Sequence, residues 1–217
     1  MIGDLCDKTI EIAMQLSGTR AEEEGGRRGE ATRVAILVAA KEVLMTAGYA
    51  KFSMRRVAAQ AGVSVGNLQY YFSTKHELTS ELLDEVVESY LFDFDSLRQA
   101  GSPTEQFTRI IRRVLEDLQT KETTFFFPEI WSLANHEPSL TGPVDAMYAR
   151  YRAVLAELAK TINPSLSDER ARQLSVFISA SIEGHTVFIG YNKPMADDLE
   201  AVIEMANRSF LALIAGG

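Results

Sequence analysis

Basic side chains that could bind a polyanion are concentrated in one segment of this chain, between Arg27 and His76. The segment contains eight lysine or arginine residues and two glutamates, which gives it a net charge of +6. The whole chain has a net charge of −8, so the remaining residues together carry −14. A basic segment attached to an acidic remainder indicates that one part of the molecule meets a polyanion such as nucleic acid and the other does not.

Residues suited to catalysis or metal binding show no comparable grouping. The chain contains three histidines, His76, His136 and His185, and a single cysteine, Cys6. Neither HExxH nor a pair of CxxC elements occurs, so the sequence offers no evident seat for metal chemistry. We therefore expect no enzymatic activity, no metal and no cofactor. An all-helical enzyme acting on a small apolar substrate is kept as an alternative.

Two short helical patterns joined by a tight turn lie between Phe52 and Leu78, inside the basic segment. Ala58 and Gly62 are four residues apart, where two steeply crossing helices need a small side chain and a residue that tolerates positive φ. This spacing predicts a helix-turn-helix. Its buried side is expected to include Val57, Ala58, Ala61, Val63, Leu68 and Phe72.

The rest of the chain also shows helical periodicity and no strand signal, which predicts an all-α fold of about nine helices. Residues 1–29 are expected to form a flexible or short-helical arm, because Gly25 and Gly26 interrupt its pattern. Residues 30–78 would form the helix-turn-helix domain, and residues 79–217 a helical domain for ligand binding and dimerisation. Ser53, Ser64 and either Ser73 or Thr74 are the expected helix caps.

Several features favour a cytoplasmic protein. Cys6 has no second cysteine to pair with, which fits a reducing compartment. No run of about 18 apolar residues is present, so no membrane span is expected. The N-terminal residues include acids where a signal peptide would carry lysine or arginine.

The segment ATRVAILVAAKEVLMTAGYAKFSMRRVAAQAGVSVGNLQYYFSTKHELTSELL, within residues 30–83, resembles the DNA-binding domain of the TetR family of bacterial regulators. The resemblance depends on A-G-Y after the first helix, V-A-x-x-A-G-V-S at the turn, and Y-F-x-x-K-x-E-L at the entry to the next long helix. It implies a homodimer on a palindromic operator, with half-sites roughly 34–36 Å apart on double-stranded DNA. It also implies a small-molecule effector, and a repressor released by that effector is the commonest form. A helix-turn-helix module that interacts without binding DNA is a second alternative.

The resemblance also implies which side chains contact DNA. Gln69 stands where the family usually has a tyrosine, and its amide could either bond adenine at N6 and N7 or contact phosphate. Lys75 would place its ammonium at a helix N-terminus beside a phosphate. The expected phosphate contacts are Ser53, Arg55, Ser64, Asn67, Tyr71 and Lys75. The expected base contacts are Val65, Gly66, Gln69 and Tyr70, and Arg28 and Arg33 are candidates for phosphate or the minor groove.

The effector site is predicted from aromatic residues and from polar residues within apolar helices, because a buried polar group needs a partner. The candidates are Phe107, Phe127, Trp131, Asn135, Tyr148, Tyr151 and Glu183. Glu183 could pair with an arginine, bind a cationic ligand, or form a hydrogen bond at a dimer interface. The sequence does not identify the effector.

The last two helices are the predicted dimer interface, as the resemblance implies. Small residues such as Ala180 and Gly184 keep the penultimate helix thin, so that another helix could approach closely. A seam of four helices, two from each copy, is therefore expected.

Overall fold

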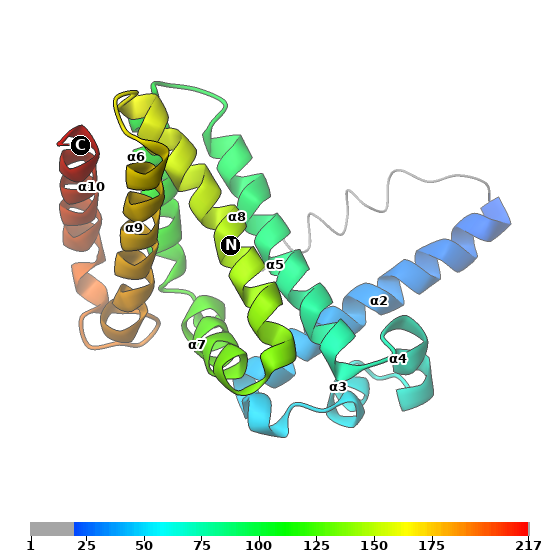
Figure 1. The fold of residues 1–217 in the computed structure, drawn as a ribbon. Helices are drawn as coiled ribbons and strands as arrows, with labels where there is room; N and C mark the ends of the chain where they lie inside the picture. Colours follow the sequence, from blue (N-terminus) through cyan, green and yellow to red (C-terminus); the bar gives the residue numbers. More distant parts are fainter. Residues whose placement is uncertain (1–19, 217) are drawn as a thin grey trace. The chain divides into compact units, whose positions relative to one another are not determined.

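The computed structural model describes residues 20–216 of the chain, apart from the side chains of residues 20–26 and Tyr90. Within these residues there are nine α-helices, two short 3-10 helices and no strand (Figure 1). The predicted all-α fold is therefore confirmed.

The α-helices are α2 (Arg20–Ala47), α3 (Met54–Gln60), α4 (Val65–Tyr71), α5 (Lys75–Leu97), α6 (Pro103–Asp117), α7 (Lys121–His136), α8 (Pro138–Ile162), α9 (Asp168–Ile189) and α10 (Leu199–Ala215). The 3-10 helices are η1 (Tyr49–Lys51) and η2 (Ala196–Asp198).

Helix α2 begins earlier than the sequence predicts. We expected Gly25 and Gly26 to interrupt any helix before residue 30, but α2 is helical from Arg20 onward. A glycine costs a helix interior only about 1 kcal/mol relative to alanine, so two glycines do not exclude a helix. Residues 20–29 are therefore the first turns of α2 rather than a flexible joint. The remainder of the expected arm, residues 1–19, lies outside the described residues.

Side-chain caps fix the starts of α5 and α6. Thr74 Oγ1 accepts a hydrogen bond from the backbone N–H of Glu77 at 3.0 Å, and the Glu77 carboxylate accepts one from the N–H of Ser73 at 2.8 Å. Ser102 and Glu105 form a reciprocal capping box at the start of α6. These bonds satisfy backbone N–H groups that have no partner inside the helix.

The chain divides into two compact units. The first contains the residues up to Ser89 together with Pro128–Val144. The second contains Tyr90–Phe127 and Asp145–Gly217. The end of α7 and the start of α8 thus belong to the same unit as the helix-turn-helix. They are separated from the rest of that unit, which ends at Ser89, by about 40 residues of the chain.

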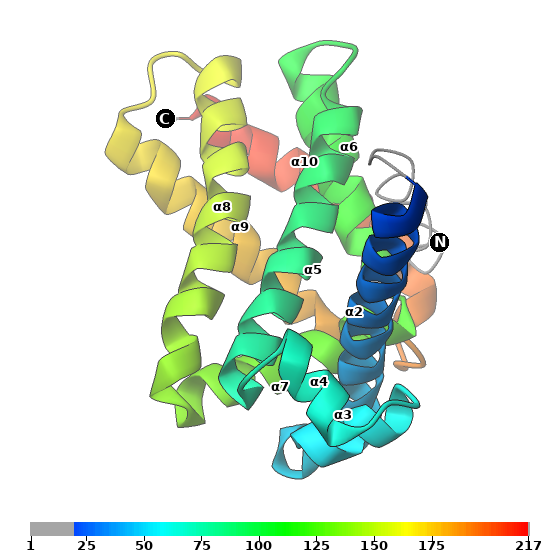
Figure 2. The same ribbon diagram turned by 90° about the vertical axis from the view of Figure 1, so that its right-hand side faces the viewer.

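In the first unit, α2, α3 and α4 gather near the N-terminal end of α5 (Figures 1 and 2). Their apolar residues recur at three- and four-residue spacing and form one core. The core includes Ile36, Leu37, Ala40, Leu44, Val57, Leu68, Phe72, Leu78 and Leu82, each at most 2% exposed.

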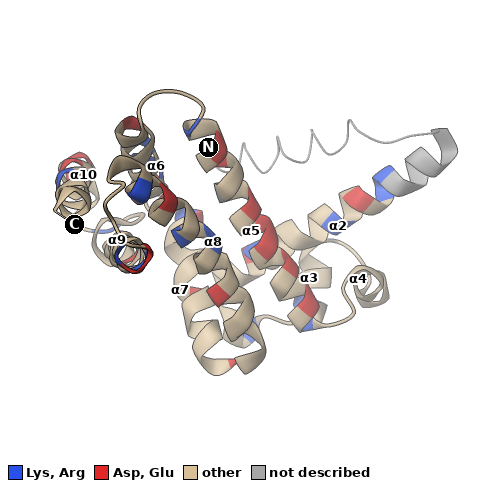
Figure 3. Ribbon diagram, turned by 45° about the horizontal axis from the view of Figure 1, so that its top comes forward, with Lys and Arg blue, Asp and Glu red and all other residues tan. Residues whose placement is uncertain are grey.

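Acidic residues follow one another along α5 after its single lysine, Lys75, at the first position (Figure 3). They are Glu77, Glu81, Asp84, Glu85, Glu88, Asp93 and Asp95. The positive charge of α5 is therefore confined to its start, next to the helix-turn-helix.

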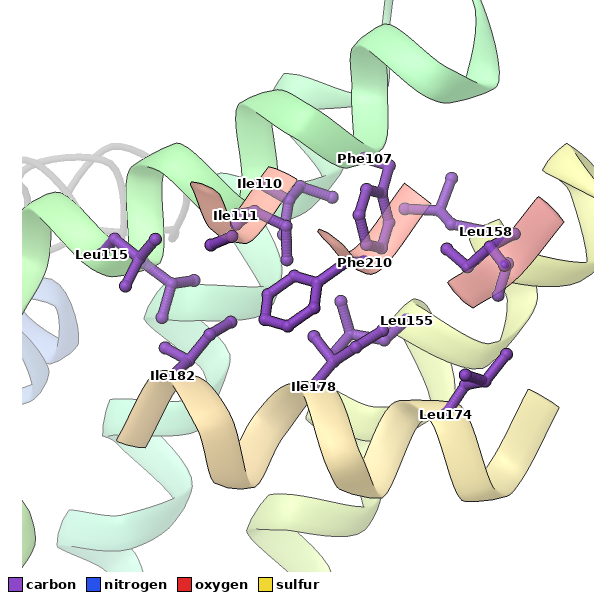
Figure 4. Packing of buried hydrophobic residues seen from close by; sticks show 14 of the residues in the cluster. Phe107, Ile110, Ile111, Leu115, Leu155, Leu158, Leu174, Ile178, Ile182 and Phe210 are labelled. Atoms are coloured by element: carbon purple, nitrogen blue, oxygen red, sulfur yellow. The ribbon is translucent and has the colours of Figure 1, made fainter. Parts of the chain in front are cut away.

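The second unit has a core contributed by α6, α8, α9 and α10. Phe210 of α10 lies in the middle of this core, with Phe107 of α6 on one side and with Leu155 of α8 and Ile178 of α9 on the other (Figure 4). All four side chains are at most 4% exposed. This packing holds α9 and α10 together in the unit.

Candidate nucleic-acid interface

The turn between α3 and α4 has the conformation that the sequence predicts. Gly62 has φ of 68°, in the left-handed region that favours glycine. The N–H of Val63 donates to the carbonyl oxygen of Ala58 at 3.0 Å, and Ala58 is 1% exposed at the helix crossing. Ala61 and Val63 are only half-buried, so they contribute less to the core than expected.

Ser53 and Ser64 cap the two helices of the helix-turn-helix, as predicted. Ser53 Oγ accepts the backbone N–H of Arg56 at 3.3 Å, and Ser64 Oγ accepts that of Asn67 at 3.0 Å. Both serines are exposed, so each hydroxyl is free to donate its hydrogen to an outside acceptor while its oxygen caps the helix.

Residues 62–66, GVSVG, also have the G-x-S-x-G spacing found at the nucleophile of many hydrolases. In hydrolases this spacing forms a sharp turn from a strand to a helix. Here it joins two helices, and the oxygen of Ser64 serves as a cap. The match therefore gives no support to a nucleophilic serine.

Helix α4 presents one exposed face and one buried anchor. Leu68 is completely buried, whereas Val65, Asn67, Gln69 and Tyr70 are exposed, Tyr70 to 83%. A Cβ atom built on Gly66 would have nothing within 4 Å. The predicted base-reading residues thus share an open surface from which a DNA groove could approach the backbone.

Tyr71 differs from its neighbour Tyr70 because it is half-buried. The two rings meet edge to face with centroids 5.1 Å apart. The Tyr71 hydroxyl would lie 3.7 Å from a Cβ atom built on Gly29, so this ring reaches back to α2.

A further basic surface lies beside the start of α3. An open hollow there is lined by Lys51, Ser53, Arg55, Arg56 and Ala59, and the three basic residues are exposed. Ser53 and Arg55 are among the predicted phosphate contacts, whereas the sequence analysis did not include Lys51 and Arg56 in that set. Their charge was visible in the sequence, but whether they share a face with Arg55 depends on where α3 begins.

Arg33 has partners within the domain that the sequence did not indicate. Its guanidinium forms ion pairs with Glu81 of α5 and with Glu30, the latter at 3.5 Å. It also lies 5.9 Å from the ring centroid of Phe72. Arg33 therefore joins α2 to α5, while Arg28 is exposed.

Lys75 occupies the first position of α5, as predicted, but its ammonium lies over aromatic rings. Nζ is 3.4 Å from the ring centroid of Tyr49 and 5.5 Å from that of Phe52. Desolvation lowers the pKa of Lys75, and the negative charge of Glu137 opposes this effect. The ammonium of Lys75 thus contacts aromatic rings of the protein itself in the absence of DNA.

The predicted effector residues are divided between the two units. Phe107, Phe127, Tyr148, Tyr151 and Glu183 lie in the second unit, whereas Trp131 and Asn135 lie in the first. Asn135 is exposed, so the premise that its amide is buried and needs a partner is wrong. It lies near the end of α7, where the helix periodicity turns it outward. Trp131 is half-buried.

Phe107 and Tyr151 belong to the core of the second unit. The Tyr151 ring packs against Phe94 with centroids 5.7 Å apart, and Phe127 meets Phe126 edge to face at 5.5 Å. These rings stabilise the unit whatever else they contact.

Glu183 and Tyr148 are brought together by α9 and α8. The Tyr148 hydroxyl donates a hydrogen bond to the Glu183 carboxyl group. Burial raises the pKa of Glu183 to about 7, and the bond from Tyr148 lowers it in part. Some of the side-chain surface is exposed, but the carboxyl group itself lies among many protein atoms. This interaction joins two of the predicted effector residues.

Helices α9 and α10 carry an exposed apolar surface. A groove between them is lined by Phe177, His185, Val202, Met205 and Phe210 among others. The most exposed apolar side chains are Val176, Phe177, Val187, Phe188 and Met205, each at least 46% exposed. An apolar surface of this kind indicates an interaction site.

The described residues contain no group of three or more His, Cys, Asp or Glu side chains placed to hold a metal ion. None of their helices is long and apolar enough to cross a membrane.

The helical fold, the helix-turn-helix and the exposed face of α4 together define a DNA-binding transcriptional regulator. Residues 36–82 match the family described as bacterial regulatory proteins, tetR family. Residues 103–215, more than half of the chain, match the family described as BetI-type transcriptional repressor, C-terminal. The chain belongs to the TetR family of ligand-responsive, DNA-binding transcriptional regulators.

Individual relatives agree with this assignment. The chain is 29% identical over 171 residues to an HTH-type transcriptional regulator in the dhlA 5′ region of Xanthobacter autotrophicus, covering 76% of this chain and 83% of that protein. It is 26% identical over 152 residues to the HTH-type transcriptional regulator RutR of Escherichia coli K12, covering 69% of each.

Solved structures show the same fold. Salmonella enterica GusR has a TM-score of 0.73 at 16% identity, over 86% of this chain and 96% of that one. A TetR-family regulator from Mesorhizobium loti has a TM-score of 0.70 at 20% identity, over 86% and 98%. The matches named here are to regulators, so they do not favour the enzyme alternative.

Proposed function

We propose that this regulator is a homodimeric repressor that binds a palindromic operator through α4 and leaves it when a small molecule binds. The observation that carries the proposal is the exposed face of α4, where Gln69 and Tyr70 project beside the open surface of Gly66. The family that matches the C-terminal residues is described as a repressor, which supports repression rather than activation. Because its target is chromosomal DNA, the protein would act in the bacterial cytoplasm.

The roles of individual residues follow from their positions. Base edges would be read by Val65, Gly66, Gln69 and Tyr70, all exposed on α4. Phosphates would be held by Ser53, Arg55, Ser64, Asn67, Tyr71 and Lys75, with Lys51 and Arg56 added because they line the same hollow as Arg55. Phosphate contacts of this kind fix the register of the protein, while the base contacts give specificity.

The dimer would form through α9 and α10. Their exposed apolar side chains support this choice, because a soluble monomer rarely exposes such a surface without a partner. The effector would bind in the second unit, near the hydrogen-bonded pair of Tyr148 and Glu183 and the aromatic residues around it.

Selection of binding sites from a random DNA library tests the proposal directly. A palindromic sequence with half-sites about one DNA turn apart is expected, followed by a matching footprint. A reporter gene under this operator should be repressed by the protein. If no sequence is enriched and the protein shows no salt-dependent binding to duplex DNA, the proposed function is wrong.

Substituting Lys75 by alanine tests the phosphate assignment. We expect weaker binding to every sequence by a similar factor, and a salt slope reduced by about 1. Anisotropy titrations at several salt concentrations measure both quantities. Lys193→Ala, which removes the same charge from the loop after α9, is the control and should leave the slope unchanged. An unchanged slope for Lys75→Ala would remove Lys75 from the phosphate contacts.

A further inference from the structure

Glu129 of α7 contacts the segment between α2 and α3, although 80 positions of the chain separate it from its partner there. Its Oε2 accepts a hydrogen bond from the backbone N–H of Tyr49 at 2.9 Å. Both residues belong to the first unit, which includes the end of α7 and the start of α8. Glu129 is half-buried, and a hydrogen bond to a charged acceptor in such a place is stronger than one between neutral groups.

This hydrogen bond supplies a helix cap that the segment itself lacks. Tyr49 opens η1, and Gly48 before it has no side chain that could cap the helix. The first N–H groups of a helix have no partner inside it, so the Glu129 carboxylate satisfies one of them. Gly48 has φ of 71°, and a Cβ atom built there would lie 3.3 Å from Glu129 Oε2. Glycine at position 48 thus serves both the turn and the close approach of the carboxylate.

The residue that Glu129 holds is also the aromatic support of Lys75. The Tyr49 ring stacks on Phe52 with centroids 6.2 Å apart. The ammonium of Lys75 lies 3.4 Å from the centroid of the Tyr49 ring and 5.5 Å from that of Phe52. Phe52, which is buried, ends η1. The hydrogen bond at the backbone of Tyr49 and the cation–π contact at its ring therefore link Glu129 to Lys75.

A fixed place for the Lys75 ammonium favours its binding to an anion. A lysine side chain that moves freely in water loses rotamer entropy when it is held against a phosphate. Lys75 is half-buried and already rests on the Tyr49 ring, so part of this entropy is lost before DNA binds. Its position at the start of α5 places the ammonium at a helix N-terminus, which also favours a phosphate. Displacement of the Tyr49 ring would remove the advantage in entropy.

We propose that Glu129 is a positioning residue for DNA binding, which acts by holding Tyr49 where its ring supports the ammonium of Lys75. The inference rests on the proposed function, in which Lys75 contacts a phosphate. It gives a role in DNA binding to a residue of α7, outside the helix-turn-helix. A carboxylate in a DNA-binding unit would by its charge alone repel phosphates. Loss of this hydrogen bond should instead weaken DNA binding, even though it removes a negative charge.

Two substitutions of Glu129 separate the effect of its hydrogen bond from that of its charge. Glu129→Ala removes both, whereas Glu129→Gln removes the charge and keeps an oxygen that can accept from the N–H of Tyr49. The probe is a labelled random-sequence duplex of about 30 base pairs, long enough for two half-sites. We expect Glu129→Ala to bind it about threefold more weakly than Glu129→Gln, with a shallower salt slope. Glu129→Gln should bind at least as tightly as wild type.

The same two substitutions in a Lys75→Ala background test the route through Lys75. With no ammonium to support, Glu129→Ala and Glu129→Gln should bind the duplex with equal affinity. A cap that only stabilised the fold would weaken binding in both backgrounds alike. Thermal unfolding followed by circular dichroism sets a titration temperature at which every variant is folded.

The outcomes separate this inference from the proposed function. A wild-type protein without salt-dependent binding to duplex DNA would overturn both. If Lys75→Ala weakens binding but the two Glu129 variants bind alike, the proposed function stands and the positioning role is wrong. The role is likewise wrong if Lys75→Ala leaves binding unchanged. A difference between the Glu129 variants that persists without Lys75 would show a general effect of the cap on the unit and would also overturn the role.

Discussion

Gln69 stands in the middle of the exposed face of α4, one residue after the buried Leu68 and one before the exposed Tyr70. Its amide can donate and accept at once, which is the pattern that adenine presents in the major groove. A phosphate offers acceptors only, so it would use the amide N–H₂ alone. A contact of Gln69 with adenine and a contact with phosphate therefore predict different effects of substituting Gln69.

Substituting Gln69 by alanine should cost about 1–3 kcal/mol of binding at one base pair of the operator and leave the other positions unaffected. Titrations of the variant against a complete set of single-base operator changes measure this pattern. Asn67→Ala, on the same helix but assigned to phosphate, should weaken binding to all of these operators alike. Uniform weakening by Gln69→Ala as well would place Gln69 on phosphate.

Glu183 makes the stability of the fold depend on pH. Its pKa is raised from 4.5 to about 7 in the folded protein, chiefly by burial. Below pH 4.5 the carboxyl group is protonated in both the folded and the unfolded chain. As the pH rises toward 7, the unfolded chain ionises first, so this residue progressively destabilises the folded state.

Substituting Glu183 by glutamine should remove this destabilisation. Relative to the variant, the wild-type protein should lose up to about 3 kcal/mol of unfolding free energy between pH 5 and pH 8. Urea denaturation at the two pH values measures the difference. Burial also raises the pKa of Asp117, to about 6, but Asp117 is present in both proteins, so its contribution cancels when their pH dependences are compared. An equal pH dependence in the two proteins would contradict the role of Glu183.

At the scale of elements, the helix-turn-helix has glycine at two positions for different physical reasons. A Cβ atom would meet nothing within 4 Å at Gly62 or at Gly66, so neither position is crowded inside the protein. Gly62 has φ of 68°, whereas Gly66 lies in the first turn of α4. The first therefore serves the backbone of the turn, and the second leaves space on the surface proposed to face DNA.

Alanine at these two positions should consequently have opposite effects. Gly62→Ala should destabilise the protein by about 1 kcal/mol, because an L-residue is strained at this φ. Gly66→Ala should stabilise α4 by about 0.5 kcal/mol but weaken operator binding, because its methyl group occupies the approach to the groove. Denaturant unfolding and DNA titration of both variants measure the two effects. If Gly66→Ala binds the operator as tightly as wild type, the backbone does not approach the DNA there.

At the scale of the whole molecule, two copies of the chain are needed to place two recognition helices on a palindrome. The proposed seam on α9 and α10 includes Phe177 and Phe188, which are 53% and 63% exposed in a single chain. Because these rings are not part of the core, they can be changed without unfolding the protomer.

Substituting Phe177 by glutamate should dissociate the dimer while leaving the protomer folded, because two copies of a buried negative charge would face one another at the seam. Sedimentation velocity at micromolar concentration measures the change, and operator affinity should fall with it. Phe92→Glu is the control, since Phe92 is 60% exposed but lies on α5. A wild-type protein that sediments as a monomer would contradict the seam.

The sequence by itself determined the features that depend on residues a few positions apart. The all-α fold, the caps at Ser53 and Ser64, the positive φ of Gly62 and the start of α5 at Lys75 all follow from helix periodicity and local hydrogen bonding. Such interactions form within about one helical turn, so their spacing is visible in the chain.

Only the tertiary structure decided which distant residues meet. Arg33 reaches Glu81 across 48 positions, and the N–H of Tyr49 reaches Glu129 across 80. Neither pairing has a sequence period, because each depends on how whole helices pack. For the same reason, the sequence did not reveal that Asn135 is exposed or that residues Pro128–Val144 belong to the unit with the helix-turn-helix. Local chemistry thus identified the exposed residues of the helix-turn-helix that we propose to face DNA, and packing decided which other residues hold them.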